Sequence, residues 1–350
     1  MQMLWERVNV ARSHLACLWK VGMSTISKIK TSAKISPLNE IVRRFQHGDV
    51  VFRALTVLAG LVVLAAVVAM GYSLWSTTPL PREKFGLGFI LSTDWDPVQE
   101  SFGALPFIYC TLVTSLVALI IAVPVGLGIA IFLSELAPNW LRQPVGYLIE
   151  LLAAVPSVIF GLWALYVLVP ILVKPSSDFL SESLGFLPIF AGPVLGPSRF
   201  AASIVLSIMI LPTISALCRD VFLAIPNNQR EAALALGATK WEMISQVLVP
   251  YGLSGILGSV ILGLGRALGE TIAVTMVIGN NRDLTASILH PGYTMASIIA
   301  NEFAEATYDL YVQSLIEIAL ILFVLTLILN SIARLLVWQV ARRTPSEARA

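Results

Sequence analysis

Residues 107–134 read FIYCTLVTSLVALIIAVPVGLGIAIFLS, an apolar run that contains no charged side chain. About 20 consecutive apolar residues allow an α-helix to cross the hydrocarbon core of a bilayer, and this run is longer. Lipid offers the backbone no hydrogen-bonding partner, so the crossing segment must satisfy its own polar groups as a helix does. This stretch therefore predicts an α-helical membrane protein.

The composition of the whole chain agrees with that prediction. Of its 350 residues, 57% are hydrophobic and only 13% are charged, and the mean hydropathy is +0.83. A soluble domain carries about 25% charged residues, so most of this chain has lipid as its solvent. The net charge of +2 excludes a strong global attraction to nucleic acid.

Six runs of sufficient length predict six transmembrane helices in an all-α fold. Proline occurs inside several of them, which membrane helices tolerate when neighbouring groups satisfy the freed carbonyls. The expected spans are Phe52–Trp75, Phe107–Ser134, Leu151–Val173, Phe200–Cys218, about Val247–Gly279, and Val312–Ala333.

Basic residues indicate how these spans are oriented. The segments 1–53, 135–144, 219–246 and 334–350 hold 17 lysines and arginines, whereas the three loops on the other side hold five. Because basic residues accumulate on the cytoplasmic side, we expect both termini to be cytoplasmic.

The domain organisation expected from this pattern is simple. Residues 1–50 form a basic cytoplasmic extension, 51–340 a single transmembrane domain and 341–350 a cytoplasmic tail. The simplest interpretation of the extension is a solvated, positively charged tail. Attachment to the anionic headgroups of the lipid bilayer is the alternative.

The residue types that bind metals are few and scattered. Cys17, Cys110 and Cys218 lie too far apart for a zinc pattern, and their odd number argues against a disulfide framework. The three histidines are equally dispersed. We therefore expect no metal site, no cofactor and no catalytic residue in this chain.

The loop between the fourth and fifth spans contains a short helix. Residues 219–250 read RDVFLAIPNNQREAALALGATKWEMISQVLVP. We expect a helix from near Asn228 with Glu231 in its first turn, followed by strong helix formers and ended by Gly237. So short a helix is marginal alone in water, so a partner should pack against it.

That loop resembles the EAA loop of the membrane subunits of bacterial ABC importers. The resemblance lies in Glu231, Ala232 and Ala233, then Gly237 four residues later, with Val247, Val249 and Pro250 at the end of the loop. It implies a type I ABC importer permease fold, with residues 226–246 as the coupling loop that docks into an ATPase subunit. The chain contains no G-x-x-x-x-G-K-[ST] phosphate-binding loop, so the ATPase should be another chain. A glycine-capped helix end without a partner is the alternative interpretation.

The fifth span carries two charges. Residues 251–278 read YGLSGILGSVILGLGRALGETIAVTMVI, with Arg266 near the middle and Glu270 one turn later. Charges inside a bilayer cost about 2.5–3.5 kcal/mol each, so both should face protein or water. On a continuous helix they share a stripe of small and polar residues, and bulky residues fill the opposite face. The polar stripe is Ser259, Gly263, Arg266, Glu270 and Ala273, and the bulky one is Leu257, Ile261, Leu264, Leu268 and Ile272.

Two interpretations of this charged pair remain open. Arg266 and Glu270 either neutralise each other within the helix as a structural pair, or they line a substrate pathway. Arginine four residues before glutamate is the weaker order for helix pairing. A planar guanidinium also suits a tetrahedral oxyanion, which favours the pathway.

Three separate segments resemble one branch of these importers, the C-type permease subunit of the high-affinity phosphate ABC transporter. They are GLGRALGETIAVTMVIGN at 263–280, ELLAAVPSVIFGLWAL at 150–165 and DWDPVQESFGALPFIY at 94–109, and the resemblance extends over about residues 50–340. It implies phosphate as substrate, with Arg266 and Glu270 as the family's intramembrane arginine and acid. It also implies an assembly with a homologous second permease, two ATPase copies and an extracytoplasmic phosphate-binding protein.

Glu270 also suggests how phosphate is selected. Phosphate keeps a proton at neutral pH and sulfate does not, so a carboxylate that accepts a hydrogen bond tolerates phosphate and repels sulfate. A permease for sulfate or molybdate is the nearest alternative. An ion-coupled secondary transporter would show paired repeats, and a membrane-bound enzyme would show clustered His, Asp or Glu; neither pattern is present in the sequence.

Overall fold

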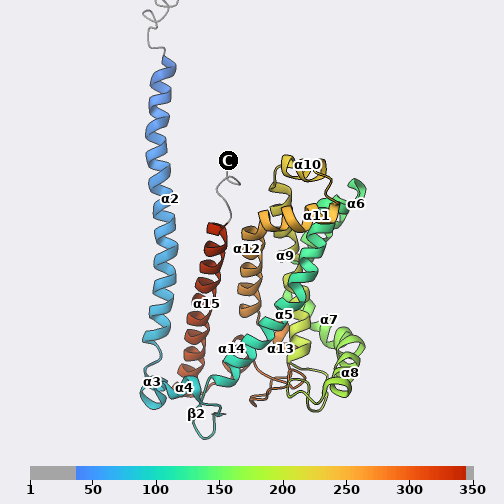
Figure 1. Cartoon of the computed structure of the whole chain (residues 1–350). Coiled ribbons are helices and arrows are strands. Elements are labelled where there is room, and N and C mark those ends of the chain that lie inside the picture. Colours follow the sequence, from blue (N-terminus) through green and yellow to red (C-terminus); the bar gives the residue numbers. More distant parts are fainter. Residues whose placement is uncertain (1–36, 344–350) are drawn as a thin grey trace, which may run out of the picture. The chain divides into compact units, whose positions relative to one another are not determined.

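Figure 1 shows a computed structural model of the chain, which describes the backbone of residues 37–343 and the side chains of residues 51–339. Most of the expected basic extension 1–50 and of the tail 341–350 lies outside these residues. Contacts divide the chain into two compact units that meet between Met70 and Gly71.

The described chain is built almost wholly from helices. The two strands of the described residues form one hairpin. In it, Trp95 pairs with Phe102 and Asp96 pairs with Ser101. Three stretches form wider π-helical turns: Phe132–Leu136, Ala164–Val173 and Met243–Leu248. The remaining elements are α2 (Pro37–Ser76), α3 (Pro79–Phe85), α4 (Gly88–Leu91), β1 (Trp95–Asp96), β2 (Ser101–Phe102), α5 (Leu105–Ile131), α6 (Asn139–Ala153), α7 (Ser157–Trp163), α8 (Lys174–Leu184), α9 (Arg199–Ala224), α10 (Asn227–Ala235), α11 (Lys240–Glu242), α12 (Val249–Gly269), α13 (Ile272–Val277), α14 (Met295–Glu302) and α15 (Asp309–Arg343).

The prediction of six membrane-spanning helices is confirmed. Within the described residues, six helices are long and apolar enough to cross a bilayer. They are Val51–Ser76, Leu105–Leu136, Ser157–Leu184, Arg199–Ala224, Lys240–Gly269 and Asp309–Gln339.

The expected third span, Leu151–Val173, is wrong at its beginning. Helix α6 ends at Ala153, and a new helix begins only at Ser157. Pro156 separates them with an extended ψ of 138°, because proline lacks the N–H that a continuing helix requires and disfavours helical geometry in the residue before it. The apolar residues on both sides of Pro156 hide this break from a hydropathy argument.

Helix α9 lies at the centre of the unit formed by residues 71–343. Its apolar window is 61% buried, against 28% for the spans that contain α5 and α12. Small residues allow close packing around it: a Cβ added at Gly263 of α12 would lie 3.0 Å from Ile214 of α9, and one at Gly126 of α5 would lie 3.1 Å from the same side chain. Central α9 thus supports the helices on either side.

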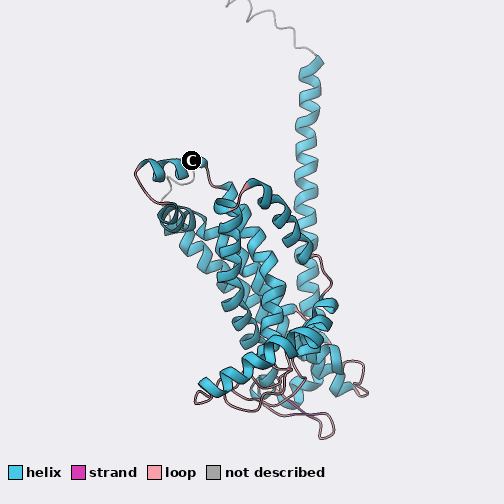
Figure 2. Cartoon of the chain, turned by 90° about the vertical axis from the view of Figure 1, so that its right-hand side faces the viewer, coloured by secondary structure: helices cyan, strands magenta, loops and turns pink. Residues whose placement is uncertain are grey.

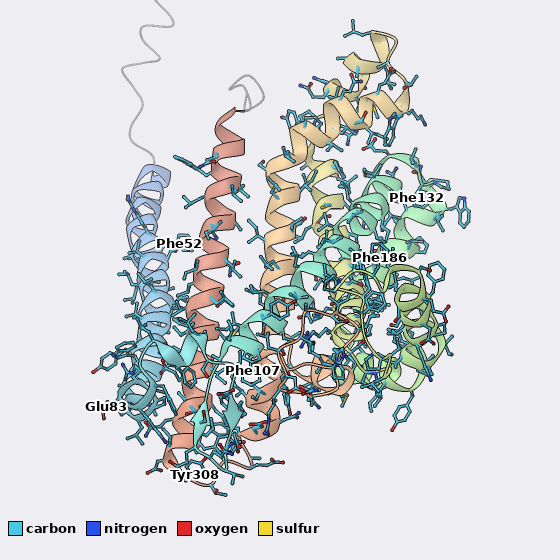
Figure 3. The ribbon with its side chains drawn as sticks, turned by 60° about the horizontal axis from the view of Figure 1, so that its bottom comes forward. Phe52, Glu83, Phe107, Phe132, Phe186 and Tyr308 are labelled. Carbon is cyan, nitrogen blue, oxygen red and sulfur yellow. The ribbon has the colours of Figure 1, made fainter. Side chains whose placement is uncertain are left out.

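The two ends of this unit differ in structure. Helices α10 and α11 lie at one end, and the hairpin lies at the opposite end (Figure 1). The longer loops gather at the hairpin end (Figure 2). Helix α5 runs between the two ends, with Phe107 near its beginning and Phe132 just past its last residue (Figure 3).

A buried carboxylate organises the hairpin end. Glu302 is 3% exposed, and its Oε2 accepts hydrogen bonds from Trp95 Nε1 at 2.8 Å and from the Tyr311 hydroxyl at 2.7 Å. Its Oε1 accepts from Arg282 Nη2 at 2.7 Å. These bonds join the hairpin, the loop before α14 and the first turn of α15, and Phe107 packs against the ring of Trp95.

A buried arginine holds the loop between α13 and α14. Arg199, the first residue of α9, is 1% exposed. Its guanidinium donates to the backbone carbonyls of Asp283, Thr285 and Ser287 and to the hydroxyl of Thr285. This loop is therefore pinned onto the end of the central helix.

We predict that Glu302→Ala destabilises the protein far more than Glu305→Ala, its matched control. Hydrogen bonds to a buried charge contribute about 1.5–3 kcal/mol each, so losing this acceptor should lower the free energy of unfolding by about 3 kcal/mol or more. Glu305 is exposed and its side chain lies outside this network. Thermal unfolding of the detergent-solubilised variants measures the difference, and equal transition temperatures would contradict the assigned role of Glu302.

Candidate functional site

The fifth span is interrupted where the sequence predicted a continuous helix. Helix α12 ends at Gly269, Glu270 is extended with ψ of 126°, and α13 begins at Ile272. Glu270 Oε1 accepts a hydrogen bond from the backbone N–H of Ala273 at 3.4 Å, one of the free donors at the start of α13. The carboxylate therefore folds back onto the backbone and does not continue the stripe of α12.

The break changes the setting of both charged residues. Arg266 lies in the last turn of α12, where a cation complements the negative end of the helix dipole. Glu270 lies at the positive end of α13. These placements stabilise each charge locally, and among the described side chains no ion pair joins Arg266 to Glu270. The interpretation as an intrahelical neutral pair is therefore wrong.

Arg266 is half-buried, and its guanidinium forms one long hydrogen bond. Its Nη1 donates to Thr213 Oγ1 of α9 at 3.3 Å, and its other donors have no partner among the described residues. Thr213 follows Pro212, which lies inside α9. A guanidinium with most of its donors free is available to an anion.

Arg266 opens onto a cleft of about 970 Å³ between α9, α12 and α15. The polar groups around this cleft come from all three helices, and none of the described residues that line it is acidic. The lining consists of Thr213, Gly258, Ile261, Leu262, Gly265, Arg266, Leu327, Asn330, Ser331, Arg334 and Val337.

The lining differs from the two stripes expected on α12. Glu270 is absent from it, and Ile261, expected on the lipid face, is part of it. Leu268, also expected on that face, is buried at 1% exposed. The break at Glu270 removes Glu270 from the stripe, but Ile261 and Leu268 precede it. Their placement follows from packing: Ser259 and Gly263 of the expected polar stripe lie against Cys218 and Ile214 of α9, so the cleft lies beside that stripe.

Sequence reasoning missed the contribution of α15 to the cleft. Leu327, Asn330, Ser331 and Arg334 recur at the spacing of one helix face, which is a signal that the sequence does carry. Arg334 lies just beyond the expected end of the sixth span, where a basic residue has an ordinary explanation as a flanking charge. Only the packing of α15 against α12 shows that these residues share a cleft with Arg266.

This cleft offers donors and positive charge. Two guanidinium groups, an amide and two hydroxyls can hydrogen-bond an oxyanion, and the apolar walls exclude part of the competing water. Within residues 51–339, no group of three His, Cys, Asp or Glu side chains is placed to hold a metal ion. The chemistry that this arrangement supports is reversible binding of an anion.

The second candidate site is the loop that contains Glu231, Ala232, Ala233 and Gly237. Helix α10 begins at Asn227, so Glu231 lies beyond the first turn, contrary to the expectation. The expected stop at Gly237 is confirmed by its φ of +88°. The N–H of Gly237 donates to Leu234 O at 3.0 Å and that of Ala238 to Ala233 O at 3.2 Å, which is a Schellman cap that requires the left-handed conformation.

A second helix begins directly after this cap. The Thr239 side chain accepts from the backbone N–H of Glu242, and the Glu242 carboxylate accepts from the backbone N–H of Thr239. This capping box, T-x-x-E, is visible in the sequence as a start signal. Together the two caps define a rigid turn between α10 and α11.

Helix α10 is anchored on one side and open on the other. Ala233 is buried at 9% exposed, whereas Leu236 is 89% and Trp241 72% exposed. Glu231 and Ala232 are also exposed. The exposed side of the loop therefore combines an acid with large apolar groups, an arrangement typical of a protein-binding surface.

One ion pair holds α10 against the transmembrane helices. Arg230 Nη2 lies 2.8 Å from Glu135 Oε1 in the π-helical turn after α5. The same guanidinium donates to the backbone carbonyls of Phe222 and Ile225 at the end of α9, each at 2.6 Å. Both partners of the pair are largely buried, so Arg230 ties α10 to the ends of α5 and α9.

One helix connects the two candidate sites. Residues Lys240–Gly269 form a single span that begins beside α10 and ends just past Arg266. At 1.5 Å per residue, roughly 40 Å separate Lys240 from Arg266 along this helix. The span is helical throughout, but it includes the π-helical turn Met243–Leu248, so the loop and the cleft are linked through one irregular stretch of helix.

Comparison with known proteins gives close relatives along most of the chain. The phosphate transport system permease protein PstC of Xylella fastidiosa is 45% identical over 86% of this chain and 94% of its own. The PstC of Mesorhizobium japonicum is 44% identical over 87% of this chain and 94% of its own. The PstC of Pasteurella multocida is 44% identical over 90% of this chain and 98% of its own.

Solved structures are more distant. The MetNI methionine ABC transporter in an inward-facing conformation has a TM-score of 0.47 and 17% identity, covering 68% of this chain and 94% of that chain. The family of the chain follows from its sequence. Residues 122–342 match the binding-protein-dependent transport system inner membrane component family. By this match and by its identity to the PstC permeases over more than four-fifths of its length, the chain belongs to the family of binding-protein-dependent transport system inner membrane components.

Proposed function

We propose that this chain is the membrane-spanning permease subunit of an ATP-driven importer of inorganic phosphate. The observation that carries the proposal is the 45% identity to a phosphate transport system permease over 86% of the chain. The acid-free cleft that contains Arg266 supports it independently, because its donors suit a tetrahedral oxyanion.

The orientation proposed for the chain places both termini in the cytoplasm. The distribution of basic residues supports it, because the loop that contains α10 belongs to the basic side. The hairpin and the segment held by Glu302 then face outward, where an extracytoplasmic phosphate-binding protein would dock. Helix α10 faces inward, toward an ATPase subunit.

The proposed assembly contains a homologous second permease and two ATPase copies. ATP-driven closure of the ATPases moves α10, and the Arg230–Glu135 pair carries the movement into α5 and α9. The span Lys240–Gly269 carries it to Arg266. Hydrogen bonds hold the phosphate while it passes from an outward to an inward opening. No covalent bond is formed or broken.

The direct test is uptake of labelled phosphate by vesicles that carry the whole complex and internal ATP. We expect uptake to require ATP and to be insensitive to excess sulfate. In Arg266→Ala it should fall by about tenfold to 150-fold, since a hydrogen bond to a charged group contributes about 1.5–3 kcal/mol and the neighbouring donors of the cleft include no second cation on α12.

Co-purification of the ATPase subunits with Arg266→Ala controls for assembly. Competition by sulfate would reassign the complex to another oxyanion. Full uptake by an assembled Arg266→Ala complex would show that Arg266 has a structural role and does not bind the substrate.

Glu270→Gln separates the charge of this residue from its role as a helix cap. Glutamine retains an oxygen that accepts from the Ala273 N–H, so the start of α13 should persist. We expect phosphate uptake to become sensitive to sulfate, because a neutral amide no longer repels a fully ionised anion. An unchanged ratio of phosphate to sulfate transport would refute a selective role for the carboxylate.

Leu236→Ser tests α10 as the docking element. Burial of a leucine side chain stabilises a contact by about 1.5–3 kcal/mol, so affinity for the ATPase subunit should fall by about tenfold or more. Leu195→Ser is the matched control, because Leu195 is 62% exposed in the loop between α8 and α9. Titration of purified ATPase against each permease variant measures the affinity, and equal values for the two variants would contradict docking at Leu236.

A further inference from the structure

Arg334 is a second cation on the cleft that the proposed pathway leaves unused. It lies on α15 with an exposed side chain, and among the described residues it forms no ion pair or hydrogen bond. By contrast, Arg230 and Arg282 are each paired with a carboxylate. The donors of an unpaired guanidinium beside a polar cleft must hydrogen-bond either a ligand or water.

The position of Arg334 relative to Arg266 follows from the packing of α15 against α12. A Cβ added at Gly265 would lie 3.9 Å from Asn330 Oδ1, so Asn330 is level with the turn of α12 that carries Arg266. Arg334 follows four residues later, about 6 Å further along α15. Because α15 runs opposite to α12, Arg334 lies nearer the end of the unit that carries α10.

A flanking basic residue at the cytoplasmic end of a span is the ordinary explanation for Arg334. That explanation does not require a particular helix face. Asn330 and Ser331 lie one turn before Arg334 on the side of α15 that lines the cleft, and all three are part of its lining. Their shared face, together with the absence of acid among the described lining residues, points to an anion.

We propose that Arg334, Asn330 and Ser331 form a second binding station for a tetrahedral phosphate group, on the cytoplasmic side of Arg266. The inference rests on the proposed function, in which an anion moves along this cleft. The phosphate group belongs either to the transported inorganic ion or to the headgroup of an anionic lipid, since both present the same oxygens to the guanidinium.

A second station has a physical purpose in a pathway. An anion bound by Arg266 alone must break all of its contacts at once in order to leave. Several weaker sites in succession allow it to enter and still depart, as in ion channels. Arg334 would accept the anion as Arg266 releases it.

The first measurement reports the local potential and does not depend on transport. Ser331→Cys is introduced into the whole complex, with Cys17, Cys110 and Cys218 of this chain replaced by serine. Its reaction rates with a negatively and a positively charged thiol reagent are then compared. Adding Arg334→Gln should slow the anionic reagent and speed the cationic one by about fivefold each, the effect of one unit charge a few ångströms away in water, so the ratio of anionic to cationic rates should fall by about 25-fold. Inorganic phosphate should slow the reaction only while Arg334 is present.

The second measurement is phosphate uptake in proteoliposomes made from neutral lipid or from neutral and anionic lipid mixed. If inorganic phosphate is the ligand, Arg334→Gln raises KM by about 1.5-fold to fivefold in both lipids, as expected for a solvent-exposed charge, and Arg334→Lys restores most of the loss. If a lipid headgroup is the ligand, the variant loses its response to anionic lipid while KM in neutral lipid stays unchanged.

Lys174→Gln is the matched control for loss of one positive charge, because Lys174 is exposed at the start of α8 and lies outside the cleft lining. Reagent rates and uptake that are the same in Arg334→Gln as in this control would overturn the second station. A wild-type complex that carries no phosphate would count against the proposed function instead, and the reagent rates would still decide whether the station binds an anion.

Discussion

The free energy required to keep a charge inside a bilayer determines much of this structure. Arg266 has one long hydrogen bond, to Thr213, and no carboxylate partner among the described side chains. Exposure to lipid would cost about 2.5–3.5 kcal/mol or more, so the guanidinium has to face water, protein or an anion. The cleft between α9, α12 and α15 provides that environment, and the end of α12 provides a favourable dipole for the cation.

The same constraint explains why the fifth span breaks where it does. Ending α12 at Gly269 places Arg266 in a last helical turn and frees Glu270 to cap α13. Each charge is stabilised by a helix end, so neither has to be neutralised by the other. Arg266 therefore remains available for a ligand, which a self-neutralised pair would not permit.

Two helix caps, one ion pair and one helical span connect this cleft to the loop at the far end of the unit. The Schellman cap at Gly237 and the capping box at Thr239 fix the turn between α10 and α11. Arg230 ties α10 to α5 and α9, and the span Lys240–Gly269 continues directly to Arg266. Under the proposed function, α10 is the element that an ATPase would move, and these packed helices and the buried ion pair link it to the cleft.

Local signals in the sequence predicted part of this arrangement. Apolar run lengths identified six spans, and Gly237 identified the end of α10, because both depend on the local chain alone. The break at Glu270 depends on a side chain that caps the following helix, and periodicity does not detect such a bond. Arg334 could not be assigned to the cleft because that requires knowing how α15 packs on α12. Glu302 and Arg199 were missed because partners such as Trp95 and Asp283 are distant from them in the sequence.

The central claim is that the cleft beside Arg266 is a water-filled pathway for phosphate. A cysteine introduced at position 213 tests this claim most directly. Thr213 contacts Arg266 and lines the cleft, so Thr213→Cys, with the native cysteines of this chain replaced by serine, retains Arg266 and puts a thiol where its hydroxyl partner was. The account predicts that a charged thiol reagent added to the assembled complex modifies this cysteine, and that inorganic phosphate slows the reaction while sulfate does not. A cysteine that is unreactive, or that reacts at the same rate with and without phosphate, would contradict the claim.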